Sequence, residues 1–305
     1  MIVATWNLEN LYLPGGEFGP RDQAAYDAKL DALAATIEAI GPDVLAVQEV
    51  GDPAALDDLT ERIGGTWHVA LSQQTDDRGI RVGFISRTAI ADATEFRRFP
   101  DRLAPVQVED DGETTQEMGR GGLAVSAGGL DLVACHLKSK LLSFPGGRFN
   151  PRDEGERARY AAYALYRRAG EAVTVRAHAD TLLPGSVVVL GDLNDDVQAA
   201  TTQLLLGPPG SEIGTPGFER PDQGDARRLW NVAPLIPAER RYTRIYRGRR
   251  ELIDHVLVSK AVVDRVTRVD TATTDLPSID DDPSRRRDAA GSDHAPVIVE
   301  LSASA

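Results

Sequence analysis

A short apolar strand that ends in paired polar groups constrains the fold more than any other segment of the chain. It lies within residues 186–196, in the run Ser-Val-Val-Val-Leu-Gly-Asp-Leu-Asn-Asp-Asp. Val187–Leu190 shows no polar alternation, which predicts a strand buried on both faces, and Gly191 ends it. Asp192 and Asn194 are two positions apart, so on an extended chain their side chains point the same way. The segment predicts either a polar site at the end of a central strand or an Asx-rich turn.

The length and composition bound the class of protein. The chain has 305 residues, 42% of them hydrophobic, and no linker, composition shift or repeat divides it, so we expect one domain over residues 1–305. Residues 1–7 predict a strand rather than a signal peptide, and no apolar run reaches the roughly 18 residues of a membrane span. The single Cys135 excludes an intrachain disulfide and a cysteine-based zinc site. We expect a cytoplasmic protein by default, or a secreted one whose signal peptide was removed, with no membrane contact and no obligate protein partner.

The charge limits the functions that the chain can serve. A net charge of −13 argues against a protein that coats nucleic acid, because such proteins are basic. It does not exclude an enzyme that acts on phosphates, since bound cations reverse the local field. Basic residues also cluster locally, as solvated surface or as phosphate contacts, near residues 138–140, 148–152, 240–250 and 285–287.

Hydrophobic periodicity predicts many strands and few helices. Helices are expected at 22–40, 53–63 and 153–182. Strands are expected at 2–6, 43–48, 66–71, 81–86, 122–127, 130–136, 186–191, 241–246, 252–258, 265–270 and 295–301. The polar segments 101–120 and 272–292 predict long loops. Because helices separate groups of strands, we expect an α+β fold with sheets in the centre and helices outside.

Six of the predicted strands begin or end in acid, amide or imidazole groups. Taken alone, each group also fits a turn cap, a solvated strand end or a structural histidine. Asp254 is an exception, because a carboxylate inside an apolar strand must be paired or hydrogen-bonded. One pattern repeated six times favours a shared site, built from Asn7, Gln48 with Glu49, His136, Asp192 with Asn194, Asp254, and Asp293 with His294. His255 follows Asp254 on the same strand and is expected to point to the opposite face.

These residues resemble the endonuclease/exonuclease/phosphatase superfamily, whose fold is DNase I-like. The matching elements occur in the family's order and span residues 5–296. They are Trp6-Asn7-Leu8, Val47-Gln48-Glu49, His136, Gly191-Asp192-Leu193-Asn194, Ile253-Asp254-His255 and Ser292-Asp293-His294-Ala295-Pro296. The resemblance implies a four-layer α/β/β/α sandwich, with the active site between the edges of two packed sheets.

The resemblance also implies a metal site. Glu49 would be the primary ligand of Mg²⁺, with Asn7 and Asp293 beside it, and Mn²⁺ or Ca²⁺ would substitute or assist. Mg²⁺ prefers carboxylate and water oxygens and usually takes only one or two carboxylates. The bound ion would neutralise charge on a phosphate ester.

The remaining matched residues would carry the proton transfers. By the resemblance, His294 is paired with Asp254, which would fix the imidazole tautomer. Either His294 or Asp192 would act as the base, and His136 and Asn194 would donate hydrogen bonds to phosphate oxygens.

Two further segments bear on the substrate. His136-Leu-Lys-Ser-Lys140 and residues 241–248 look like a branch of bacterial DNases. Lys138 and Lys140 are expected to contact flanking phosphates, and Tyr242 with nearby arginines to line a nucleic-acid groove. Arg81 matches a position with a polar phosphate contact in many relatives. The alternative for residues 240–250 is an exposed hairpin.

The sequence therefore favours a Mg²⁺-dependent phosphodiesterase acting on nucleic acid, foremost a DNA endonuclease with little sequence specificity. The rival hypothesis is a metal-dependent phosphatase or lipid phosphodiesterase of the inositol-phosphate or sphingomyelinase type, which the negative charge favours. A third hypothesis is a catalytically inactive binding member, which would be expected to have lost ligands; here every matched core position is filled.

Overall fold

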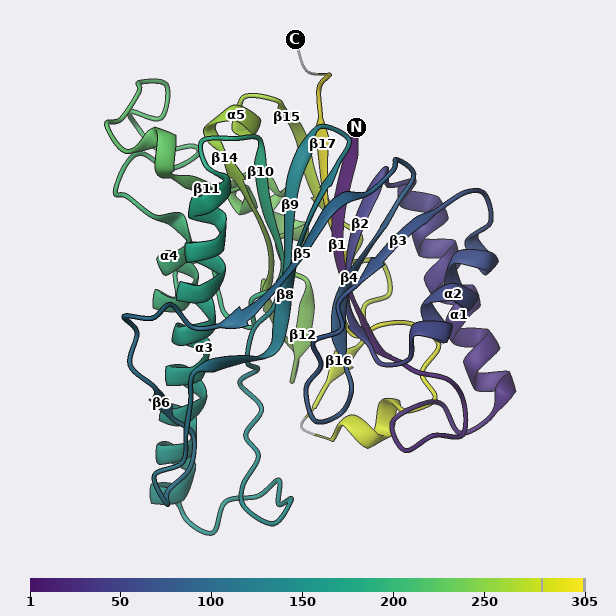
Figure 1. Cartoon of the computed structure of the whole chain (residues 1–305). Coiled ribbons are helices and arrows are strands. Elements are labelled where there is room, and N and C mark those ends of the chain that lie inside the picture. Colours follow the sequence, from purple (N-terminus) through teal and green to yellow (C-terminus); the bar gives the residue numbers. More distant parts are fainter. Residues whose placement is uncertain (281, 304–305) are drawn as a thin grey trace.

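Two six-stranded sheets pack face to face in the computed structural model, which describes residues 1–280 and 282–303 (Figure 1). The first sheet has the order β15-β17-β1-β2-β4-β3. Its strands are β1 (Ile2–Leu11), β2 (Val44–Val50), β3 (His68–Leu71), β4 (Arg81–Ser86), β15 (Val266–Thr271) and β17 (Val297–Leu301). The second sheet has the order β11-β14-β10-β9-β8-β5. Its strands are β5 (Ala91–Arg98), β8 (Glu117–Ala127), β9 (Leu130–His136), β10 (Val187–Asp192), β11 (Leu229–Asn231) and β14 (Asp254–Ser259).

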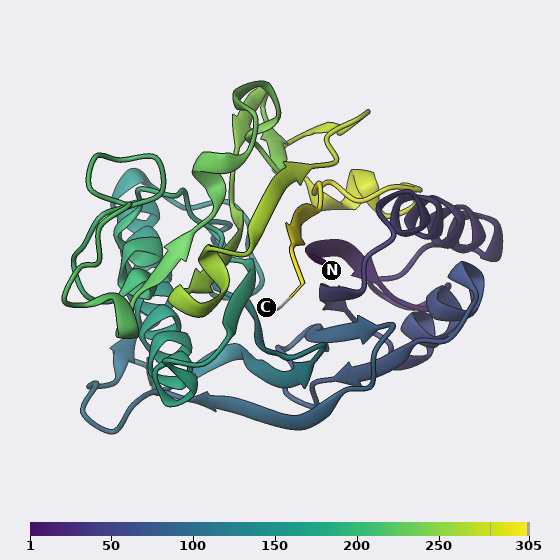
Figure 2. The ribbon, with the colours of Figure 1, turned by 90° about the horizontal axis from the view of Figure 1, so that it is seen from above.

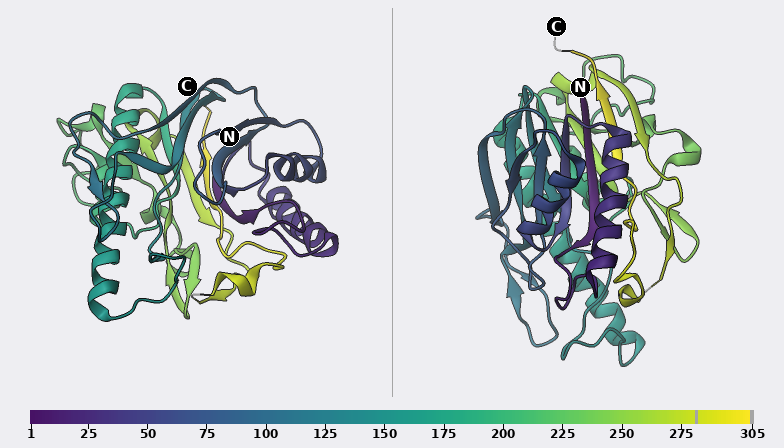
Figure 3. Two further views of the ribbon diagram at one scale, coloured as in Figure 1. Left: turned by 60° about the horizontal axis from the view of Figure 1, so that its bottom comes forward. Right: turned by 90° about the vertical axis from the view of Figure 1, so that its right-hand side faces the viewer.

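Helices cover the outer faces of both sheets (Figure 2). Helices α1 (Gln23–Ile40) and α2 (Pro53–Ile63) lie on the first sheet, as the right panel of Figure 3 shows. Helices α3 (Glu154–Leu182) and α4 (Ala200–Leu206) lie on the second. This order of layers confirms the predicted α/β/β/α sandwich, and the three predicted helices are found within one residue of their expected bounds.

Helix ends follow local sequence signals. The Asp22 side chain accepts a hydrogen bond from the backbone N–H of Ala25, and Gly41 ends α1 in the left-handed conformation. A short helix α5 (Lys260–Val263) follows β14. Short 3₁₀ helices are η1 (Asp225–Arg227), η2 (Ala233–Leu235), η3 (Ala238–Arg240) and η4 (Pro283–Arg286). None of the helices in the described ranges is long and apolar enough to cross a membrane.

Strand β10 is buried along its whole length, as its unbroken apolar run predicts. Val188 and Leu190 point into the core between the two sheets. Val187 and Val189 point the other way and pack in the core beneath α3. Burying a side chain of this size stabilises the fold by roughly 1.5–3 kcal/mol, so β10 is a rigid support for the polar residues at its end.

Strand register places the polar residues at one edge of the sandwich. β10 pairs with β9 in parallel and with β14 in antiparallel orientation, so Asp192 lies between His136 and Asp254. In the other sheet, β1 pairs with β2 in parallel, and Asn7 lies opposite Gln48.

The two segments expected to be long loops contain ordered elements. In 101–120, β6 (Val106–Gln107) and β7 (Thr114–Thr115) form a hairpin, which Asp110 ties to α3 through Arg159 at 2.8 Å. In 272–292, β16 (Ser278–Ile279) joins β12 (Arg244–Tyr246) and β13 (Arg249–Glu251) in a three-stranded sheet. The sequence showed no strand at β5 because this edge strand is largely exposed and polar.

Candidate active site

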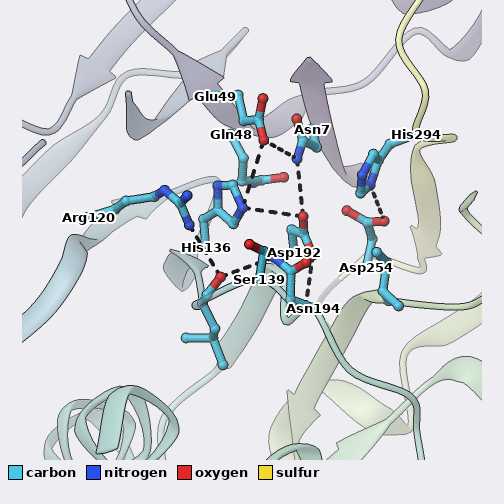
Figure 4. A network of polar contacts seen from close by, with 12 residues as sticks. Asn7, Gln48, Glu49, Arg120, His136, Ser139, Asp192, Asn194, Asp254 and His294 are labelled. Atoms are coloured by element: carbon cyan, nitrogen blue, oxygen red, sulfur yellow. Dashed lines mark hydrogen bonds and ion pairs between the residues drawn. The ribbon is translucent and has the colours of Figure 1, made fainter. Parts of the chain in front are cut away.

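The ends of β1, β2, β9 and β10 bring four polar side chains together (Figure 4). Asn7 Nδ2 donates to Glu49 Oε1 at 3.2 Å and to Asp192 Oδ2 at 3.1 Å, so this amide joins the two sheets. His136 Nε2 lies 3.4 Å from Asp192 Oδ2 and 4.0 Å from Glu49 Oε1. The side chains of His136 and Asp192 are each only 2% exposed. The structure thus assembles one site from residues 185 positions apart.

The backbone at the strand ends is unusual in a way that aims these side chains. Glu49 and Asn194 adopt left-handed conformations, with φ of 62° and 53°, which non-glycine residues rarely adopt. Asn194 N donates to Asp192 Oδ1 at 2.8 Å, and Asn194 Nδ2 donates to Leu137 O at 3.0 Å. Gly191 is required just before them, because a Cβ there would lie 1.9 Å from the carbonyl oxygen of Cys135. Such strained residues concentrate at functional sites.

A buried acid–imidazole pair faces this group from the start of β14 and the segment just before β17. His294 Nδ1 and Asp254 Oδ2 are 2.8 Å apart, as predicted from the sequence. Burial acts to lower the pKa of His294, but the carboxylates of Asp254 and Asp293 outweigh it and raise that pKa well above 6.5. These carboxylates therefore favour the protonated form of His294. Its position is fixed by Trp6, whose Nε1 donates to His294 O at 2.7 Å.

The other two titratable groups are shifted in ways that suit proton transfer. Burial and then the neighbouring Asp254 carboxylate raise the pKa of Asp192 to about 7. Burial and then the charge of Arg120 lower the pKa of His136 well below 6.5, so its imidazole is neutral. Near neutral pH, Asp192 can therefore accept a proton while His136 can donate a hydrogen bond from a neutral ring.

Two places near these residues carry donor groups that fit a divalent cation. Burial opposes ionisation of Glu49, yet the charges of Arg78 and Arg120 hold its pKa below the usual value, so the carboxylate is charged. The second place is Asp192, Asp254 and His294, whose possible ligand atoms lie within 4.8 Å of one another. Asp254 Oδ1 is buried and has no hydrogen-bond partner among the described residues. Because His294 Nδ1 already pairs with Asp254, an oxygen-preferring ion fits better at Glu49.

Of the other expected metal ligands, Asn7 contacts Glu49, whereas Asp293 contacts Glu9 through its backbone N–H. Asn7 presents its amide nitrogen to Glu49, and its Oδ1 accepts from the N–H of Glu9 at 2.9 Å. Asn7 is therefore a hydrogen-bond donor to both carboxylates in this arrangement. Metal binding by Asn7, Glu49 and Asp293 stays a prediction.

The four residues expected to bind substrate are held by the protein itself. Lys138 Nζ donates to Leu141 O at 2.9 Å, and Lys140 Nζ pairs with Asp195 at 2.8 Å. Arg81 donates to the carbonyl oxygens of Gly79 and Gly51, while Tyr242 is only 7% exposed, beneath the Arg250 guanidinium at 4.4 Å. No hydrogen bond or ion pair within the described ranges links any of the four to Glu49, His136 or Asp192. Their contacts with substrate also stay predictions.

Two arginines beside Glu49 were not among the site residues predicted from the sequence. Arg120 Nε lies 3.1 Å from Asp76 Oδ2, and Arg78 Nε lies 3.9 Å from the same oxygen. Arg120 also donates to Leu137 O at 3.3 Å, the carbonyl that Asn194 binds. Two cations share the Asp76 carboxylate here, beside the charged Glu49. No spacing in the sequence signals it, because the three residues come from separate segments.

Asp195, in the bend that follows β10, is the centre of a buried ion pair. Its carboxylate lies 3.1 Å from Arg168 Nε of α3 and accepts from Thr201 Oγ1 at 2.7 Å. It thereby ties the end of β10 to the outer helices. His255 points away from the site as predicted, and its Nε2 lies 2.9 Å from Asp195 O.

Comparison with known proteins gives one family and one fold. The family model described as "Endonuclease/Exonuclease/phosphatase family" matches residues 4–294. No curated protein sequence matches significantly. Similar solved structures include a 3′-5′ exonuclease from Neisseria meningitidis, at 19% identity and TM-score 0.58, covering 99% of this chain and 100% of that one. An AP endonuclease from Archaeoglobus fulgidus is similar at 13% identity and TM-score 0.59, with the same coverage of both chains.

A third similar structure is a mannosyl-6-phosphatase from Bacteroides thetaiotaomicron, at 16% identity and TM-score 0.59, covering 99% of this chain and 100% of that one. At these identities the structural likenesses establish the fold alone. The family match extends over nearly the whole chain and includes every residue of the site. The chain therefore belongs to the endonuclease/exonuclease/phosphatase family of phosphoester hydrolases.

Proposed function

We propose that the protein is a Mg²⁺-dependent phosphodiesterase that hydrolyses DNA internally, with little sequence specificity. The observation that carries this proposal is the position of Asp192. Its carboxyl group, with a pKa of about 7, lies between the neutral His136 and the buried Asp254–His294 pair. A base, a neutral donor and a cation thus surround one point, which is what attack of water on a phosphate ester requires.

Each residue has a role in this reaction. Asp192 takes a proton from the attacking water, and a new P–O bond forms as the ester P–O bond breaks. The imidazolium of His294 stabilises the negative charge on the phosphorane oxygens, while Asp254 fixes its orientation. His136 and Asn194 donate to the non-bridging oxygens. A divalent cation bound at Glu49 would neutralise phosphate charge and stabilise the leaving oxygen.

A nucleic-acid substrate is supported by the surroundings of the site and by similar structures. Arg78, Arg120 and Lys138 are close enough to lower the pKa of His136, in a chain whose net charge is −13. Among the similar structures are a DNA-bound 3′ phosphatase from Neisseria and the AP endonuclease. A polyanion with phosphates on both sides of the cleaved bond would use this local charge.

The second candidate is a phosphatase acting on a small phosphate ester. The mannosyl-6-phosphatase shares the fold, and the acidic overall charge would repel a long polyanion. The same residues would perform the reaction, so only the substrate separates the two candidates.

A plasmid-nicking assay tests the proposal. Supercoiled plasmid should become nicked in Mg²⁺ and stay intact in EDTA, and Asp192→Asn should prevent nicking in Mg²⁺. Intact plasmid with Mg²⁺, Mn²⁺ and Ca²⁺, together with hydrolysis of p-nitrophenyl phosphate, would favour the phosphatase instead.

A further inference from the structure

A second group of buried charges lies next to the site, at the end of β1. Glu9 is only 8% exposed and Lys29, on α1, only 4%. Arg286, in η4, donates from Nε to Glu9 Oε1 at 2.6 Å and from Nη2 to Glu9 Oε2 at 2.7 Å. These two parallel bonds make a bidentate ion pair, the strong and geometrically specific form of this contact. The pair joins residues 277 positions apart.

The Glu9–Arg286 pair also holds the backbone that leads into His294. Glu9 Oε2 accepts from the N–H of Asp293 at 2.9 Å, and Arg286 Nη2 donates to Gly291 O at 2.8 Å. Ser292, between them, donates from Oγ to Asn7 O at 2.7 Å. The three residues before His294 are thus each hydrogen-bonded to β1 or to Arg286, which pairs with Glu9.

The backbone at Glu9 connects the pair to the metal side of the site as well. Glu9 and Asn10 are consecutive non-glycine residues with φ of 51° and 56°, a left-handed turn that each would avoid in isolation. The turn directs Glu9 N–H to Asn7 Oδ1 at 2.9 Å and Asn10 N–H to Glu49 Oε2 at 3.0 Å. One turn therefore contacts Asn7, Glu49 and, through the Glu9 side chain, Asp293.

The contacts of Glu9 favour a positioning role over a role as a metal ligand. Both Glu9 oxygens accept hydrogen bonds, from Arg286 and from the N–H of Asp293. The guanidinium of Arg286 thus occupies the side of the carboxylate that a cation would need.

We propose that Glu9 and Arg286 are positioning residues of the active site, whose ion pair fixes the Asp293–His294 segment relative to Asn7 and Glu49. The catalytic consequence rests on the function proposed above. The consequence for the backbone does not, since it concerns the folded protein without metal or substrate.

The experiment uses three test variants: Arg286→Gln, Glu9→Gln and the double variant that combines them. Each is compared with the control variant Arg285→Gln. Arg285 is a matched control, because it is the adjacent arginine, is 69% exposed and pairs only with Asp280 and Asp282 among the described residues. Two readouts are measured: amide hydrogen exchange of residues 287–295 in EDTA, and kcat and KM for plasmid or duplex DNA in Mg²⁺. Arg286→Lys keeps the charge without the bidentate contact and serves if Arg286→Gln fails to fold.

We expect faster exchange at Asp293 and a kcat about 10²-fold lower in Arg286→Gln, because small misplacements of reacting groups cost about that much. KM should stay within about twofold, since the groups act in the transition state. The double variant should be no worse than the worse single variant, because the residues act as a pair. Arg285→Gln should match the wild type in both readouts.

Unchanged exchange at Asp293 in Arg286→Gln would overturn the proposal, and so would faster exchange with unchanged kcat. An equal loss of kcat in Arg285→Gln would show a nonspecific effect and overturn it too. If the wild type cleaves no DNA, the proposed function fails, while the exchange measurement in EDTA still decides whether the pair fixes the backbone.

Discussion

Two carboxylates of the buried site, Glu9 and Asp254, differ in how completely they are hydrogen-bonded. Both oxygens of Glu9 accept hydrogen bonds, from Arg286 and from the N–H of Asp293. Asp254 pairs with His294 through Oδ2, but its Oδ1 has no partner within the described ranges. A fully bonded carboxylate holds its surroundings in place, whereas one with a free buried oxygen retains the capacity to bind a ligand or a proton.

The pKa values of Glu9 and Asp192 are shifted alike. Burial raises both to about 7, and a neighbouring carboxylate adds to the shift, Asp293 for Glu9 and Asp254 for Asp192. Arg286 opposes the shift at Glu9, and His294 opposes it at Asp192. Geometry therefore separates their roles: the bidentate contact with Arg286 occupies Glu9, whereas Asp192 lies between His136 and Asp254.

The largest effect is expected at Asp192, which lies opposite Asp254 on the adjacent strand. Asp192→Asn removes the proposed base and should lower kcat about 10³- to 10⁴-fold, at the upper end for general-base catalysis. Asp196→Asn is the matched control, because Asp196 is exposed on the same turn and should keep wild-type activity. Steady-state hydrolysis of DNA in Mg²⁺ measures both. Activity of Asp192→Asn within tenfold of the wild type would remove Asp192 from the reaction.

A smaller loss is expected when the imidazole loses its partner. Asp254→Asn deprives His294 of the carboxylate 2.8 Å away, so the pKa of His294 falls and its orientation is less fixed. We expect kcat to fall about 10²- to 10³-fold, with the protein still folded by circular dichroism. An unchanged kcat would mean that His294 acts without Asp254.

Asp195, a paired carboxylate outside the site, should affect the stability of the protein more than its kcat. Asp195→Ala leaves Arg168, whose side chain is 6% exposed, without its carboxylate, and should lower the free energy of unfolding by about 3 kcal/mol. Urea denaturation measures this loss, and kcat of the folded variant should stay within about threefold of the wild type. A kcat loss comparable with that of Asp254→Asn would mean that Asp195, too, contributes to catalysis.

The position of each residue in the chain explains which parts of the site the sequence could predict. Glu49, His136, Asp192 and Asp254 lie at or next to the ends of apolar strands, and Asn7 follows the apolar first half of β1. Their residue types and positions could therefore be read from the sequence. Their convergence follows from strand register, which the family resemblance supplied. The residues that support them were not visible, because each contact depends on where distant segments meet: Glu9 with Arg286, Asp195 with Arg168, and Arg120 with Asp76.

Tyr242 shows that neighbouring residues in the sequence do not reveal how exposed a side chain is. Its neighbours in the sequence are arginines, which suggested an aromatic lining for a nucleic-acid groove. The ring is instead only 7% exposed, covered by Arg250. Composition within a segment identifies candidate contacts, but whether a side chain faces solvent or the interior depends on packing that spacing does not reveal here.

The smallest predicted effect is on stability against pH in the protein without metal. The folded pKa of Asp192, about 7, is above its ordinary value of 3.8, so its contribution is fully present below about pH 4 and is lost as pH rises to about 7. The raised pKa of His294 has the same sign, with loss as pH rises above 6.5. In EDTA, Tm should therefore decline by a few degrees between pH 5 and pH 8, and Asp192→Asn should reduce the decline, because an amide does not titrate. A decline of equal size in Asp192→Asn would show that Asp192 is already ionised in the folded protein.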